Sequence, residues 1–263
     1  YNDDLSILDR PFYLMEKIDG IVLTTNEVSN RKITAVEFEQ ISKEWLNTFI
    51  ELHSIDFKSV GLGDLGKPIG YVDRQIEIWS KQYKAAMTSE IESADKVIKW
   101  LNENKPVSKQ ISLIHNDYKY DNVVYRNEKW NEINSILDWE MCTIGDPLMD
   151  LGTSIAYWTM SNDHPVILNG LKSPTVLPGN PSRSKIVELY CEQTQTKLDD
   201  FVFYYVYGLF KIAVIVQQIY FRYKKGLTGD KRFSKLDKYA KVLSDTAWQL
   251  SLIHISEPTR RKH

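Results

Sequence analysis

Cysteine is scarce in this 263-residue sequence, which contains only Cys142 and Cys191. The two residues lie far apart and neither belongs to a CxxC pair, so we expect neither a disulfide framework nor a zinc site. This usage favours a reducing, intracellular compartment, without distinguishing cytoplasm, mitochondrion and peroxisome. The sequence also lacks a signal-peptide pattern and an initiator Met, and we expect it to be a fragment of a longer protein.

Neither sign of charge is in clear excess, because 33 Lys and Arg residues oppose 35 Asp and Glu residues and leave a net charge of -2. A nucleic-acid-binding protein needs a clustered basic face, so we expect no nucleic-acid partner. The remaining composition, 43% apolar and 26% charged, is ordinary for one large globular domain or two small ones.

One apolar run, from Phe201 to Phe221, is long enough to cross a bilayer. However, Lys211, Gln217 and Gln218 interrupt it, and a charged residue near the centre of a membrane span is costly. We therefore predict a buried helix of a globular protein and no membrane span.

The spacing of apolar residues predicts a mainly helical chain. Asp146-Pro147 is typical of a helix start, with Asp as N-cap and Pro at the first helical position. Ser182 is expected to cap another helix, whereas the segments 56–70 and 161–182 are rich in turn-forming residues and are expected to be loops. Further helices are predicted over 33–52, 71–87, 89–103, 183–194, 201–221 and 231–250.

Short strand-like runs occur in two places. The first covers residues 12–16 and precedes a turn at Asp19-Gly20. The others cover 111–114, 122–125 and 133–137, and the "RNEK" turn joins the last two into a predicted hairpin. The expected fold class is thus α+β and mainly helical, with a small sheet insert.

Polar residues gather at that insert, in the stretch "SLIHNDYKYDNVVY" and just after the hairpin. Asp117 and Asn122 bracket a short loop between two predicted strands, and Asp138 follows the next strand, so the three side chains are expected to converge. Their oxygen atoms suit a hard cation such as Mg²⁺. Protein kinases place a catalytic Asp five positions before a metal-binding Asn, with a second metal-binding Asp after a hairpin. The spacing therefore predicts phosphoryl transfer.

The stretches "LIHNDYKYDNVVY" and "ILDWEMCTIGDPLMDL" resemble the aminoglycoside phosphotransferase family of kinase-like enzymes. They are most similar to the branch found as a domain of acyl-CoA dehydrogenase family members ten and eleven, which "LKSPTVLPGNPSRSKIVELYCEQT" also resembles. The resemblance covers roughly residues 10–225. It implies a kinase-like C-terminal lobe with a hinge strand and a catalytic-loop hairpin, which uses ATP and Mg²⁺.

The same resemblance implies roles for individual residues. It implies that Asp117 is the catalytic base, that Asn122 and Asp138 are metal ligands, and that His115 and Asp150 hold the loop in shape. It further implies that the adenine meets the main chain of a hinge formed by Met15, Glu16 and Lys17. Glu140 and Lys119 are candidates for supporting the metal or contacting phosphate or substrate, against the alternative of a solvated role.

The expected function is transfer of a phosphoryl group from ATP to a hydroxyl of a small molecule, which the resemblance suggests is a hydroxyacyl-CoA or hydroxy acid. No candidate is visible for the small N-terminal lobe or for its phosphate-binding lysine, so we expect that lobe to be missing from this chain. The alternatives are a non-catalytic kinase-like interaction or regulatory module, a part of a larger acyl-CoA dehydrogenase fusion, and a metal hydrolase with His115 as a ligand.

The letters "SLIH" occur again at residues 251–254, without an acid or amide at the matching later positions. This copy is not a second site. The segment resembles translated sequencing-adapter read-through, so the kinase-like domain is predicted over 1–250, followed by a non-native, disordered tail over 251–263.

Overall fold

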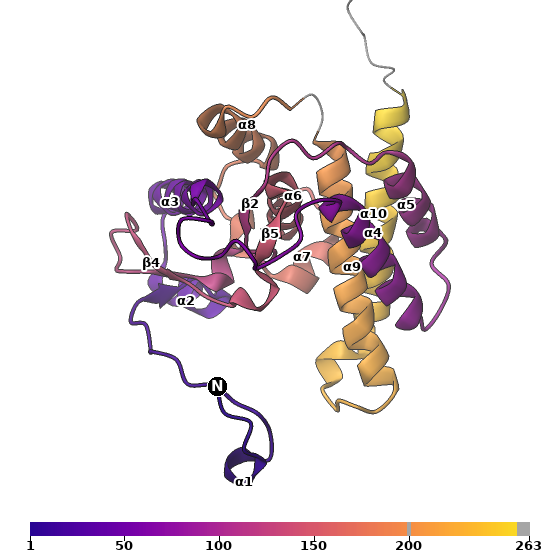
Figure 1. The fold of residues 1–263 in the computed structure, drawn as a ribbon, viewed down its shortest axis with the longest axis horizontal. Coiled ribbons are helices and arrows are strands. Elements are labelled where there is room, and N and C mark those ends of the chain that lie inside the picture. The colour runs from indigo at the N-terminus through magenta and orange to yellow at the C-terminus, as the bar shows by residue number, and fades with distance from the viewer. Residues whose placement is uncertain (199–200, 257–263) are drawn as a thin grey trace, which may run out of the picture.

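The chain folds mainly into helices and has two small antiparallel sheets, as seen in a computed structural model that describes residues 1–198 and 201–256 (Figure 1). The strands are β1 Ile21–Val22, β2 Ser112–Ile114, β3 Val123–Tyr125, β4 Ile133–Ile136 and β5 Thr143–Gly145. The helices are α1 Leu5–Leu8, α2 Thr25–Arg31, α3 Ala35–Ser54, α4 Tyr71–Ala85, α5 Glu92–Glu103, α6 Pro147–Tyr157, α7 Pro165–Leu171, α8 Arg183–Thr194, α9 Val202–Lys224 and α10 Leu236–Ser256. Short 3₁₀ turns cover Tyr120–Asn122, Trp139–Met141, Pro174–Val176 and Lys231–Lys235.

The two sheets frame the polar stretch that the sequence singles out. Strands β1, β3 and β4 form one antiparallel sheet in that order, and β2 pairs with β5 in the other. The predicted hairpin is confirmed, because β3 and β4 pair antiparallel with Val123 opposite Ile136. The loop between β2 and β3 therefore leaves one sheet and enters the other.

Helix starts follow the chemistry expected from the sequence. Asp146 caps α6 by accepting from the backbone N–H of Leu148, with Pro147 in the first turn. Ser182 caps α8 by accepting from Lys185 N. At α3, Thr34 and Glu37 form a reciprocal capping box, which explains why the helix begins at Ala35 rather than Ile33.

Helices α6 and α9 cross with their backbones in close contact. A Cβ atom added to Gly208 would lie 2.2 Å from the carbonyl oxygen of Gly152, and one added to Gly152 would lie 2.2 Å from the carbonyl oxygen of Tyr204. Neither distance is compatible with a side chain, so both positions need glycine. The crossing fixes the spacing of two helices that both reach the polar loop.

Helix α9 contains the long apolar run. It is long and apolar enough to cross a membrane, yet 72% of its most apolar window is buried inside the fold, as in a core helix. It packs with α4, α5, α6 and α10 in one hydrophobic core, while a second core joins α3 to β3 and to the loop before it (Figure 1).

Several local predictions are wrong. Residues 12–16 do not form a strand, because Phe12 makes only an isolated bridge with Asn2 and no further strand lies alongside to extend the pairing. Residues 161–182 contain α7 and a 3₁₀ turn, since His164 and Ser173 cap them and proline follows each cap. The sequence reading also missed α2 and the short strand β5.

The C-terminal helix α10 passes the predicted domain boundary. Residues 251–256 are helical where an irregular tail was expected, and Ser251 is buried with its hydroxyl donating to Trp248 O. The rest of the predicted tail, residues 257–263, lies outside the described residues.

Candidate active site

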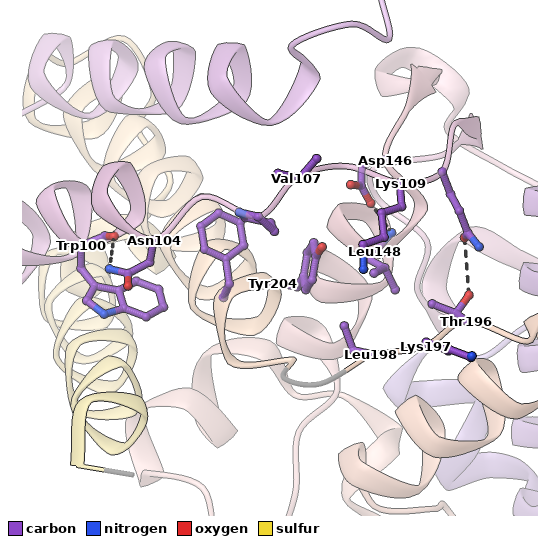
Figure 2. Close-up of a pocket in the computed structure, with 13 residues that line it drawn as sticks. Trp100, Asn104, Val107, Lys109, Asp146, Leu148, Thr196, Lys197, Leu198 and Tyr204 are labelled. Atoms are coloured by element: carbon purple, nitrogen blue, oxygen red, sulfur yellow. Dashed lines mark hydrogen bonds between the residues drawn. The ribbon is translucent and has the colours of Figure 1, made fainter. Parts of the chain in front are cut away.

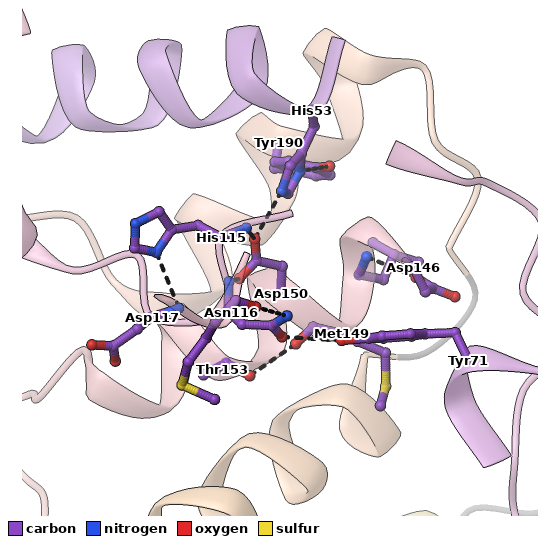
Figure 3. Close-up of polar contacts among 12 residues, drawn as sticks. His53, Tyr71, His115, Asn116, Asp117, Asp146, Met149, Asp150, Thr153 and Tyr190 are labelled. Carbon is purple, nitrogen blue, oxygen red and sulfur yellow. Dashed lines mark hydrogen bonds and ion pairs between the residues drawn. The ribbon is translucent and has the colours of Figure 1, made fainter. Parts of the chain in front are cut away.

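The polar loop after β2 is anchored on Asp150, one turn into α6 (Figure 3). This carboxylate is fully buried and accepts from two consecutive backbone N–H groups, those of His115 at 2.7 Å and Asn116 at 2.8 Å. Bidentate acceptance of this kind fixes both the position and the direction of a loop backbone. Asp150 thus makes the contacts expected of the loop anchor that the family resemblance implied.

His53 contacts the Asp150 carboxylate, a contact that the sequence did not predict. Its Nε2 lies 3.2 Å from Asp150 Oδ2 and its Nδ1 lies 2.7 Å from the hydroxyl of Tyr190. Burial alone would raise the pKa of the Asp150 carboxyl, but the hydrogen bond and charge of His53, together with His115, lower its pKa below the ordinary value. His53 lies near the end of α3, where amphipathic spacing gives no functional signal.

His115 uses both ring nitrogens inside the protein. Nε2 lies 2.8 Å from the carbonyl oxygen of Leu137, so it is the donor, and Nδ1 accepts from the backbone N–H of Asp117 at 3.2 Å. A ring engaged in this way cannot also bind a metal. In addition, no group of three or more His, Cys, Asp and Glu side chains in the described part of the chain is placed to hold a metal ion. The engagement of both ring nitrogens argues against His115 as a ligand in the metal-hydrolase alternative.

Asp117 and Asn122 are brought together as predicted. The amide nitrogen of Asn122 donates to the carbonyl oxygen of Asp117 at 2.8 Å and to its carboxylate Oδ2 at 2.9 Å. Lys119 binds the same carboxylate oxygen from the other side, with Nζ 2.7 Å from Oδ2. Both Asn122 bonds leave from its nitrogen and do not use the amide oxygen, which is the atom suited to a cation.

Asp138 lies beside this pair through the backbone. The N–H of Leu137 donates to the carbonyl of Asn122 at 2.7 Å, so Asp138 follows directly after a residue bonded to Asn122. Asp138 is exposed and adopts a left-handed conformation with φ 64°, two residues after the end of β4. A carboxylate and an amide on segments joined by this backbone bond fit a Mg²⁺ ion that takes its other ligands from phosphate and water.

The remaining candidates differ in how close they lie to this pair. Lys119 touches Asp117, whereas Glu140 is exposed on the 3₁₀ turn that follows Asp138.

The hinge candidates are not brought to the loop. Met15, Glu16 and Lys17 belong to an exposed N-terminal arm, residues 1–19, which projects away from the body (Figure 1).

A cavity of about 490 Å³ opens beside the loop, between α4 and the segment after β4. Its lining includes the polar residues Asn116 and Glu140, the aromatic residues Trp79 and Tyr71, and two cationic residues, Lys67 and Arg74. A second cavity of about 600 Å³ lies near the start of α6 and includes Asp146 and Tyr204, but none of the predicted site residues (Figure 2).

Comparison with known proteins identifies the family of the chain. The phosphotransferase enzyme family matches residues 1–181. The chain is 30% identical to mouse acyl-CoA dehydrogenase family member 10 over 256 residues, which cover 95% of this chain and 23% of that protein. It is 30% identical to human acyl-CoA dehydrogenase family member 11 over 254 residues, which cover 95% of this chain and 32% of that protein. The chain therefore spans about a quarter to a third of the length of these relatives.

Solved structures share the fold. A Ralstonia eutropha protein whose structure carries the designation aminoglycoside phosphotransferase superposes with a TM-score of 0.80 and 28% identity, over 95% of this chain and 76% of that one. Choline kinase from Cryptosporidium parvum superposes with a TM-score of 0.53 at 14% identity, over 92% and 70% of the two chains, a likeness of fold alone. The expected kinase-like, mainly helical fold is confirmed, and the chain belongs to the phosphotransferase enzyme family.

Proposed function

We propose that this chain carries the acceptor and metal-binding part of an ATP- and Mg²⁺-dependent phosphotransferase that acts on a hydroxyl of a small molecule. One observation carries the proposal most of all. Asp117 and Asn122 are hydrogen-bonded to each other in a loop whose backbone is fixed by the buried carboxylate of Asp150. A catalytic carboxylate needs such fixed geometry, because positioning supplies much of the rate in phosphoryl transfer.

The proposed chemistry assigns one task to each group. Lys119 and Asn122 both bind Oδ2 of Asp117, so we assign to Oδ1 the acceptance of the proton from the attacking hydroxyl. The oxygens of Asn122 and Asp138 would hold Mg²⁺, which when bound neutralises charge on the phosphates. The two donors on Oδ2 also fix the direction of the carboxylate before substrate arrives.

The acceptor molecule is proposed to bind in the 490 Å³ cavity beside Asn116. Lys67 and Arg74 in its lining favour an acceptor with an anionic group, whereas a polycation would be repelled. The relatives named acyl-CoA dehydrogenase family members support a hydroxy acid or a hydroxyacyl-CoA as the acceptor class.

We further propose that the nucleotide-binding lysine and the loop over the phosphates come from parts of a longer parent protein. The hinge candidates in the arm, Met15, Glu16 and Lys17, are exposed in this chain. The chain by itself is then expected to bind ATP weakly or not at all. Isothermal titration of this chain and of a longer parent with MgATP tests this, and equal affinities would contradict it.

The test of the function is Asp117→Asn in a longer parent, assayed for transfer of labelled phosphate from ATP to hydroxy acids and their CoA thioesters. Loss of a general base is expected to lower kcat by about 10²–10⁴-fold, with a smaller change in nucleotide affinity. Asp121→Asn makes the same change four residues later in the same loop and is the matched control. No transfer by the unaltered parent would favour the non-catalytic module, and phosphate release without an acceptor would favour a hydrolase.

A further inference from the structure

Lys211 is a buried cation in the middle of the apolar helix α9, with 1% of its surface exposed. Its helix neighbours Phe210 and Ile212 are buried hydrophobic residues, so an apolar side chain would suit this environment better if packing alone mattered. A buried ammonium is retained against its desolvation cost only where its partners compensate for it. The partners of Lys211 therefore indicate what the charge is for.

Those partners belong to the polar loop. Nζ of Lys211 donates to the carbonyl oxygen of Asn116 at 2.7 Å and lies 3.4 Å from the side-chain oxygen of the same residue. Nζ also lies 5.5 Å above the ring of Trp79, which forms a cation–π contact from α4.

The charges that face Lys211 come from α6 and from the loop. Burial lowers the pKa of Lys211 to about 8, while the carboxylates of Asp150 and Asp117 oppose this shift and the charge of Lys119 adds to it. Tyr71, from α4, shares Asn116 with the lysine but has a pKa raised mainly by its burial, so it stays neutral. Lys211 is therefore a cation near neutral pH and loses its proton under mildly alkaline conditions.

The bond to Asn116 acts on the peptide that precedes Asp117. In that peptide unit the carbonyl oxygen, from Asn116, accepts from Lys211, and the N–H, from Asp117, donates to Nδ1 of His115. Both polar ends of the unit are thus held. Asn116 itself has φ 68°, a left-handed conformation that Asn adopts more readily than most L-residues.

We propose that Lys211 is a positioning residue that holds the Asn116–Asp117 peptide and thereby aims the Asp117 carboxylate. The role of Lys211 in phosphoryl transfer rests on the proposed function, whereas its role in holding the loop does not. Lys211 lies in α9, 95 positions after Asn116, and no catalytic motif contains it.

The test compares two variants of this chain by hydrogen exchange followed by mass spectrometry. Lys211→Met removes the ammonium and keeps an unbranched apolar side chain. Its matched control is Gln217→Met in the same helix, because Gln217 is also buried and donates instead to Ala86 O and Thr88 Oγ1. We expect Lys211→Met to increase exchange at least tenfold in peptides covering residues 112–122, and Gln217→Met to do so only around residues 86–88.

Unchanged exchange of the loop in Lys211→Met would overturn the proposal, and so would an equal increase throughout the chain. If Lys211→Met does not fold, the pH dependence of hydrogen exchange in the unaltered chain tests the proposal instead. After correction for intrinsic rates, loop protection is expected to fall between about pH 7 and about pH 9 as Lys211 loses its proton, and a flat profile would overturn the proposal.

Activity in a longer parent separates this proposal from the proposed function. If the parent transfers phosphate, Lys211→Met is expected to lower kcat with little change in the KM for ATP, because Asp117 is misdirected while the metal ligands stay in place. A change confined to KM would contradict the positioning role. A parent without any transfer would contradict the proposed function, and the exchange result would still decide the role of Lys211 in the loop.

Discussion

The loop from His115 to Asn122 and the N-terminal arm, residues 1–19, both matched a kinase-like pattern in sequence, but only the loop is built into the body. Residues of the loop bind Asp150, Lys211 and Leu137, all of which lie elsewhere in the chain. The arm has exposed apolar side chains, such as Leu14 and Met15, and its β pairing is limited to the isolated bridge between Asn2 and Phe12. The sequence pattern predicted the loop correctly, because buried partners hold the loop backbone in one geometry. It predicted the strand over residues 12–16 wrongly, because a strand needs a neighbouring strand to pair with.

Removing the Asp150 carboxylate, which anchors the loop, is expected to have the largest effect on stability and tests the difference between the loop and the arm most directly. Asp150→Ala would leave two buried backbone N–H groups without their acceptor, and we expect the free energy of unfolding to fall by about 3–5 kcal/mol. Urea denaturation at neutral pH measures this change. Asp3→Ala in the arm, the control, should leave the midpoint unchanged, and equal effects of the two variants would remove the distinction between loop and arm.

A smaller loss in the free energy of unfolding is expected when a side chain is added at the crossing of α6 and α9. Gly208→Ala places a methyl group 2.2 Å from Gly152 O, and the overpacking should cost about 1–3 kcal/mol in spite of the better helix propensity of alanine. Thermal unfolding followed by circular dichroism measures it. Gly229→Ala, which meets no atom within 4 Å, is the control. A stabilised Gly208→Ala variant would show that the crossing is adjustable.

Acid should weaken the loop anchor in a defined pH range. The pKa of Asp150 is lowered in the folded chain, so its contribution to stability is complete above the ordinary value of 3.8 and is lost as the pH falls through the lowered folded value. One proton gives a slope of up to about 1.4 kcal/mol per pH unit. Urea midpoints measured at a series of acidic pH values should therefore fall more steeply for the unaltered chain than for Asp150→Asn. Parallel profiles would contradict the assignment.

The smallest effect is expected in the arm. Met15→Ala removes a side chain that is 70% exposed, and the free energy of unfolding should change by less than about 0.5 kcal/mol. Urea denaturation again measures it. A loss above about 1 kcal/mol would show that the arm packs onto the body in solution.

The sequence predicted the parts of the site that depend on local order. The strand ends placed Asp117 and Asn122 together, and Asp146-Pro147 gave the start of α6. The place of Asp150 as a loop anchor was implied by the family resemblance. The catalytic and metal-binding roles of Asp117, Asn122 and Asp138 stay predictions. The family and the kinase-like fold are confirmed by the comparisons.

The sequence did not predict the partners that reach the loop from distant elements. His53 and Lys211 lie on helices whose periodicity reflects packing, and nothing local distinguishes a buried histidine or lysine with a function from one without. The hinge strand was predicted wrongly for the opposite reason, because its residues have strand propensity but no adjacent strand to pair with.

The closeness of α6 and α9 also bears on when the loop takes its shape during folding. Asp150 and Lys211 lie 35 positions after His115 and 95 positions after Asn116, respectively, and their helices α6 and α9 meet at the Gly152–Gly208 crossing. Contacts so distant in sequence form after the intervening chain has closed. A polypeptide that ends before α9 would keep every letter of the catalytic motif and lose the lysine that supports it, so searches for functional fragments should require the distant helix as well as the motif.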